Sequence, residues 1–169
     1  KVVSVVVLEV TGEPEMDATL LQNADGRIQL EAHNGQIKSP KTGAQLTRGR
    51  FGTIENWLTT GHRVTWTVKV VTPGTYNVAV LTQTERNGKW EGGHKTKLTI
   101  GRAPLSATIK EQERRDNPKA NADLLDVVSM LGQITIKKPG THDITLRMEK
   151  VIKTKGIGPK LRAIQLIPA

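Results

Sequence analysis

Apolar and polar residues alternate along much of this chain with a period of two. The clearest run places an apolar residue at every second position on either side of a Pro73-Gly74 pair: Val64, Trp66, Val68 and Val70, then Tyr76, Val78 and Val80. Strands that bury one face show this period. We therefore expect two strands here, with Trp66 and Tyr76 in the core.

The sequence around Pro73-Gly74 occurs again 66 positions later, around Pro139-Gly140. Proline fixes φ at the first central position of a turn, and glycine accepts the positive φ that a type II turn needs next. Each copy therefore predicts a β-hairpin. Two such hairpins favour a sandwich over a helical or α/β domain.

Turn signals separate several further short segments of strand character, the rhythm of an all-β sandwich. The expected strands are residues 5–10, 27–32, 63–71, 75–83, 95–100, 105–110, 132–137, 142–149 and 161–167. Residues 124–131 suit either a short helix or a strand, and we favour a strand. Three long irregular stretches remain, at 85–94, 111–123 and 150–159, and long loops on a rigid sandwich commonly carry binding residues.

The chain has 169 residues, enough for one domain with a single core between two sheets. It has no cysteine, so it has neither disulfides nor thiolate metal sites. No run of about 18 apolar residues occurs, and we expect no membrane span. The chain opens on a strand-like segment without the features of a signal peptide, which is typical of a fragment or a processed chain.

Charge is uneven along the sequence. Residues 1–33 carry a net charge of −4 and residues 34–169 carry +13, giving the total of +9. A basic body of this size attracts polyanions such as nucleic acid or sulfated glycans. The simpler interpretation is that these lysines and arginines alternate with apolar residues because they lie on the solvated faces of the sheets.

The sequence contains no recognisable set of catalytic residues. The four histidines are scattered without metal-ligand spacing, and no serine lies in a nucleophile elbow. Asp116 with Asp123, or Glu85 with Glu91, are the carboxylate pairs that glycoside hydrolysis could use, but polar loops normally just expose such residues. We expect a domain without chemistry of its own.

Trp90 differs from the other aromatic residues because its glycine-rich loop, residues 86–94, has no apolar periodicity to bury it. Exposed indoles stack on sugar rings, and neighbouring polar side chains bind the hydroxyl groups. The candidate carbohydrate-binding residues are Trp90, Arg86, Asn87, Glu91 and His94, with Trp57 as a further aromatic. The alternative for Trp90 is that it folds back on its own loop. For Trp57, which precedes a strand, plugging one end of the core is as good an interpretation as contact with a ligand.

A series of short motifs resembles a known family. They are Asp25-Gly26-x-Ile28-x-Leu30-Glu31-Ala32, Phe51-Gly52-x-Ile54-x-x-Trp57, His62-Arg63-Val64-x-Trp66, Leu131-Gly132-x-Ile134 and Leu161-x-x-Ile164-x-Leu166. Their order over residues 27–169 is similar to that of carbohydrate-binding modules of the galactose-binding-domain-like jelly-roll type, near families 6 and 35. The resemblance implies an all-β, two-sheet antiparallel β-sandwich that binds glycan.

The segment Val5-Val6-Val7-Leu8-Glu9-Val10 resembles the C-terminal sandwich of bacterial α-L-fucosidases. Residues 1–26 are then a strand and connecting segment from a preceding domain, and residues 27–169 are the sandwich. Glu31 matches a family glutamate that often ligates a structural calcium. Lys160 and Arg162 stand where the family commonly has Asn or Asp, and they would repel that cation.

Together these observations predict a non-catalytic accessory module of a larger secreted bacterial glycoside hydrolase, in the periplasm or outside the cell. Its expected partners are a glycan and an attached catalytic domain, with neither nucleic acid nor membrane. The alternatives are a structural domain that packs on the catalytic domain without binding sugar, and a binder of sulfated glycan or another polyanion.

Overall fold

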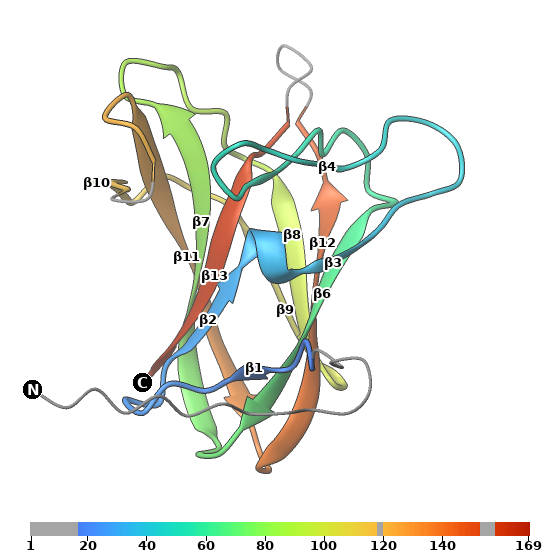
Figure 1. The fold of residues 1–169 in the computed structure, drawn as a ribbon, viewed down its shortest axis with the longest axis vertical. Coiled ribbons are helices and arrows are strands. Elements are labelled where there is room, and N and C mark those ends of the chain that lie inside the picture. The colour runs from blue at the N-terminus through green and yellow to red at the C-terminus, as the bar shows by residue number, and fades with distance from the viewer. Residues whose placement is uncertain (1–16, 118–119, 153–157) are drawn as a thin grey trace, which may run out of the picture.

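The chain folds as a jelly-roll β-sandwich of two sheets (Figure 1). The computed structural model describes residues 17–117, 120–152 and 158–169. Within them the single helical element is a 3-10 turn, η1 (Ala32–Asn34). No helix in these ranges is long and apolar enough to cross a membrane. The all-β prediction is confirmed, and the expected strand Val5–Val10 lies outside the described residues.

Seven strands form one sheet, in which β2 pairs with β13 beside the main path. In spatial order the main path contains β10 (Glu113–Asp116), β11 (Leu124–Ile136), β7 (Gly74–Glu85), β13 (Leu161–Pro168), β5 (Ile54–Glu55) and β4 (Thr47–Arg48), with β2 at Ile28–Glu31. Every pair in it is antiparallel. The segment 124–131 is thus part of one long strand, as favoured, while β10 lies in a stretch expected to be irregular.

Six strands form the other sheet, in which β3 (Gln36–Lys38) pairs with β6 beside the main path. The main path contains β1 (Leu20–Leu21), β6 (Arg63–Val70), β12 (Gly140–Lys150), β8 (Lys95–Ile100) and β9 (Ala103–Thr108). β1 runs parallel to β6 and the other pairs are antiparallel. Leu20 and Leu21 therefore belong to the sheet, and the assignment of residues 1–26 to a preceding domain stays a prediction.

The two Pro-Gly sequences do not close hairpins, and that prediction is wrong. β6 and β7 flank Pro73-Gly74 but lie in different sheets, as do β11 and β12 around Pro139-Gly140. Gly140 has φ 120°, whereas Gly74 is outside the positive region that a type II turn needs. Each Pro-Gly pair is an arch from one sheet to the other. The two arches lie side by side, because β6 pairs with β12 and β7 with β11.

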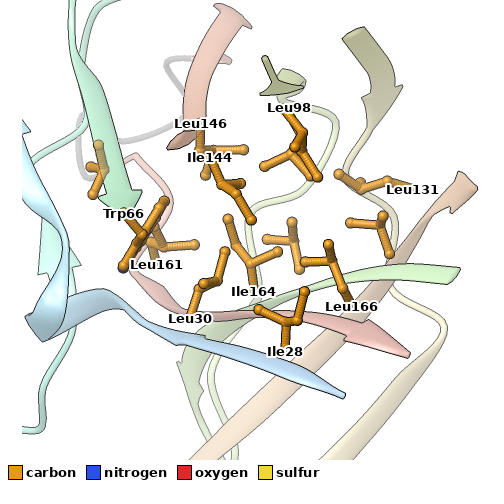
Figure 2. Packing of buried hydrophobic residues seen from close by; sticks show 14 of the residues in the cluster. Ile28, Leu30, Trp66, Leu98, Leu131, Ile144, Leu146, Leu161, Ile164 and Leu166 are labelled. Atoms are coloured by element: carbon orange, nitrogen blue, oxygen red, sulfur yellow. The ribbon is translucent and has the colours of Figure 1, made fainter. Parts of the chain in front are cut away.

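The core fills the space between the sheets. In Figure 2, Ile28, Leu30 and Ile164 of the seven-stranded sheet approach Leu98 and Ile144 of the six-stranded sheet. Trp66 and Tyr76 are each 2% exposed, as the alternation predicts. Burial of one large apolar side chain contributes roughly 1.5–3 kcal/mol, so this interior supplies a rigid frame for the loops.

Candidate functional site

A pocket of about 230 Å³ opens at one end of the sandwich. The loop after β7 and the chain that enters β13 lie at this end (Figure 1). The lining residues come from the end of β7, the following loop, the start of β11 and the segment before β13: Gln83, Thr84, Glu85, Gly88, Lys89, Trp90, Glu91, Leu124, Gly158, Pro159 and Lys160. Of the six predicted sugar-binding residues, this set contains Trp90 and Glu91.

Trp90 is fixed in the pocket wall. Its ring is half-buried and packs against the core, and Nε1 donates a hydrogen bond of 2.9 Å to Thr82 Oγ1. Gly92 passes so close that a Cβ there would lie 2.2 Å from Trp90 Cζ3. The expectation of an indole with no sheet to pack on is therefore wrong. Trp90 is instead a preformed wall, which reduces the entropy cost of binding a ligand beside it.

Two polar groups of the pocket lining lack partners. Gln83 is 6% exposed, and its Nε2 has no hydrogen-bond partner among the described residues. Glu91 Oε2 is buried and equally unpartnered within the same part of the chain. An unsatisfied buried donor or acceptor costs about 1–3 kcal/mol. The lining therefore places the polar residues Gln83 and Glu91 beside an indole wall, a combination that suits a hydroxylated ligand.

Arg86 and Asn87 do not line the pocket. Arg86 Nε donates to Ala122 O at 2.8 Å and Nη2 donates to Asp116 Oδ1 at 2.5 Å. This residue therefore ties the loop to the chain around β10 and β11. Asn87 is exposed.

His94 is fully buried and is not available to a ligand, which corrects the prediction for this residue. Its Nδ1 accepts a hydrogen bond of 3.1 Å from the backbone N–H of Ile152, so the neutral ring carries its proton on Nε2 and donates to Glu91 O at 3.1 Å. Burial lowers the pKa of His94. This histidine fixes the base of the loop.

Trp57 is also fully buried, and its predicted role as a sugar-stacking aromatic is wrong. The backbone of Trp57 lies beneath Gly158, where an added Cβ would come within 2.4 Å of Trp57 O and where φ is +67°. Only glycine fits this close approach without strain. Trp57 thus supports the pocket from the core side and offers no surface to a ligand.

Glu31 does not form a calcium site with its neighbours. Its Oε2 accepts a hydrogen bond from Arg162 Nη1, and a guanidinium beside the carboxylate opposes a hard cation. Among residues 17–117, 120–152 and 158–169, no three His, Cys, Asp or Glu side chains are grouped to hold a metal. The residues present do not fit a structural calcium at Glu31.

Sequence reasoning missed Gln83, Lys89 and Lys160 as pocket residues. Gln83 occupies an outward position of β7, where a polar residue normally indicates exposure to solvent. The fold places it between two other chain segments: Gln83 N donates to Lys160 O at 2.9 Å, and Asp126 of β11 lies opposite it. That pairing joins segments far apart in the sequence, and no local signal reveals it.

No protein family and no curated protein matches the sequence. Among solved structures the chain is similar to the α-L-fucosidase from Vibrio sp. strain EJY3, with 15% identity over 94% of this chain and a TM-score of 0.68. It is also similar to the insecticidal crystal protein Cry2Aa, with 13% identity over 89% of this chain and a TM-score of 0.56. The Podospora anserina GH26-CBM35 β-(1,4)-mannanase matches 86% of this chain at 14% identity and a TM-score of 0.49.

The matches to the fucosidase and to Cry2Aa show the fold. The chain spans about a quarter of each matched protein: 25% of the fucosidase, 23% of Cry2Aa and 28% of the mannanase. A jelly roll of this kind therefore occurs as one part of larger proteins that differ widely in what they do.

Proposed function

We propose that this chain is a non-catalytic carbohydrate-binding module of a larger, secreted bacterial glycoside hydrolase, and that it binds glycan in the pocket beside Trp90. The observation that carries the proposal is a pocket with the fixed indole of Trp90 as a wall and with the polar residues Gln83 and Glu91 in its lining. Sugar hydroxyl groups would suit these polar lining residues, each of which has a side-chain atom without a hydrogen-bond partner among the described residues. The fucosidase of similar fold and the motif resemblance add support from outside the site.

The module would act by keeping its catalytic neighbour close to the substrate, through effective concentration. The pocket is small, and each hydroxyl must exchange water for a protein partner. We therefore expect a dissociation constant of roughly 10 µM to 1 mM.

A purely structural role is the second candidate. It is favoured by the burial of Trp90 and by its hydrogen bond to Thr82, both of which a packing residue would show. Replacing Trp90 by alanine cannot separate the two roles, because loss of a half-buried indole would destabilise the loop whether or not it binds sugar.

Gln83→Met separates them. Methionine keeps the volume of glutamine and removes the unpartnered amide, so the free energy of unfolding should stay equal or rise by up to about 1–3 kcal/mol. Loss of a hydrogen bond to the glycan should weaken binding about 2- to 12-fold. Urea unfolding and a glycan array on the same preparation measure both effects.

Thr96→Val is the matched control. Thr96 Oγ1 is also buried and without a partner in the described chain, but Thr96 lies on β8 and does not line the pocket. This variant should gain stability and bind glycan normally. Unchanged glycan binding by Gln83→Met, or a wild-type chain that binds no glycan, would make the structural role the better account.

Absence of catalysis is tested separately, because Glu85 and Glu91 both line the pocket. The wild-type chain should not hydrolyse aryl glycosides, the fucoside included. Turnover that survives repurification and disappears in Glu91→Gln would show that the pocket is an active site.

A further inference from the structure

The outer face of the six-stranded sheet carries four basic side chains in one row, here called the basic row. The strand register places Lys38 opposite Arg63, Arg63 opposite Arg147, and Arg147 opposite Lys97. Neighbouring strands lie about 4.8 Å apart, so the row spans roughly 14 Å across β3, β6, β12 and β8.

The row faces away from the core. Its neighbours along the strands are buried between the sheets: Val64, Leu98 and Leu146. Since side chains of a strand alternate between its two faces, the basic residues point outward. Arg63 and Arg147 are exposed and Lys97 is partly so.

The arrangement does not stabilise the fold. Like charges directly opposite each other in a sheet are destabilising. Within the described residues no carboxylate lies within ion-pair distance of the row: Glu149, the acid in electrostatic range of Lys97, pairs with Lys95 at 3.3 Å. Asp143 accepts a hydrogen bond of 2.8 Å from Thr67 Oγ1. The repulsion is therefore retained without an internal counter-charge in contact with it.

The row borders a shallow hollow of about 560 Å³. Arg63, Lys97 and Arg147 line it from the row, Arg102 adds a fourth cation, and Asp143 contributes one carboxylate. The next cross-strand row consists of hydroxyl groups: Thr65 and Thr145 share a hydrogen bond of 3.0 Å, and Thr99 lies opposite Thr145. The face thus presents cations beside hydroxyls.

We propose that this face binds a sulfated polysaccharide. Guanidinium groups form paired hydrogen bonds with tetrahedral oxyanions, and the threonine hydroxyls are placed to bind hydroxyl groups of the same sugar chain. The hollow contains no aromatic side chain on which nucleic-acid bases could stack. The choice of a glycan rests on the proposed carbohydrate function, but the face belongs to the opposite sheet from the pocket and does not share its residues.

The test compares wild-type protein with the double variant Arg63→Gln/Arg147→Gln for binding to immobilised dextran sulfate at several salt concentrations. Lys137→Gln/Lys138→Gln is the matched control, because it removes the same charge from exposed positions off the row. The row variant should lose about tenfold or more in affinity at low salt, and the slope of log affinity against log salt should fall by about two. The control should lose less than about threefold.

Two other polymers identify the chemistry. Neutral dextran should not bind the row, and polygalacturonate should bind more weakly than dextran sulfate. Equal losses in the row variant and the control would overturn the proposal, because net charge alone would then explain binding. Equal row-dependent binding of single-stranded DNA would overturn the assignment to a glycan. Gln83→Met should bind dextran sulfate normally, so failure at the pocket and failure at the row are separate outcomes.

Discussion

The outer faces of the two sheets use charge in opposite ways. On the seven-stranded sheet, Arg162 pairs with Glu31, and Asn117 donates to Asp126 Oδ1 at 3.1 Å. These groups are largely buried, and opposite signs stand together. On the six-stranded sheet, the basic row exposes like charges on adjacent strands. The buried charges of the seven-stranded sheet are paired within the chain and stabilise the fold. The basic row has no such pairing among the described residues, so fold stability does not explain why it is there.

Breaking the compensated face should produce the largest effect. Arg162→Met removes the buried cation that pairs with Glu31 and attracts the carboxylate of Asp126, and loss of one partner of a buried pair costs about 3–5 kcal/mol. Urea unfolding measures this change. Adding Glu31→Gln to Arg162→Met should recover part of the lost stability. If Arg162→Met alone were as stable as wild type, the two faces would not differ in how charge contributes to the fold.

Reversing one charge on the other face should stabilise the protein. Arg147→Glu places a carboxylate opposite both Arg63 and Lys97, which should add about 0.2–1 kcal/mol for each cross-strand neighbour. The gain should shrink in high salt, because exposed charges are screened. The thermal midpoint at two salt concentrations checks this, and a destabilised variant would mean that Arg147 supports the fold.

The smallest effect concerns pH. Burial raises the pKa of Asp126 above its ordinary value of 3.8, although Arg162 and Asn117 oppose the shift. The folded state then holds the proton more tightly than the unfolded state, so this stabilising contribution is present below pH 3.8 and is lost as pH rises through the raised pKa.

Asp126→Asn removes that titration and keeps an oxygen for Asn117. The stability of Asp126→Asn relative to wild type should therefore increase as pH rises through this window. Arg147→Gln should show no such trend, because it leaves Asp126 and its neighbours unchanged and lies on the other sheet. Denaturant unfolding of both variants from below pH 3.8 to neutrality measures the contrast, and parallel curves would contradict the sign given for Asp126.

Local sequence predicted the strands well because alternation is a property of each strand alone. It misled at Pro73-Gly74, since a chain that reverses within one sheet and a chain that crosses to the other sheet use the same residues. Only the pairing of β6 with β12 and of β7 with β11 separates the two cases. That pairing is set by contacts between distant segments.

The candidate site was predictable only where its residues lie together in one segment of the sequence. Trp90 and Glu91 stand out within their own loop, whereas Gln83 enters the pocket lining through its pairing with Lys160. His94 was expected to be available because its loop lacks periodicity, and Trp57 suited either a core plug or a ligand contact, yet both are buried. The basic row is invisible in the sequence, because its members become neighbours only through the register of four strands.

The position of β13 inside the seven-stranded sheet affects the order in which the domain can form. β13 lies between β7 and the strands β2 and β5, so Leu166 pairs with Val78 on one side and with Ile28 on the other. During synthesis the seven-stranded sheet cannot close until Leu161–Pro168 has left the ribosome. Pairings this distant in sequence are slow to form. Until they form, β7 has an open edge, and the nascent chain is exposed to aggregation during that interval.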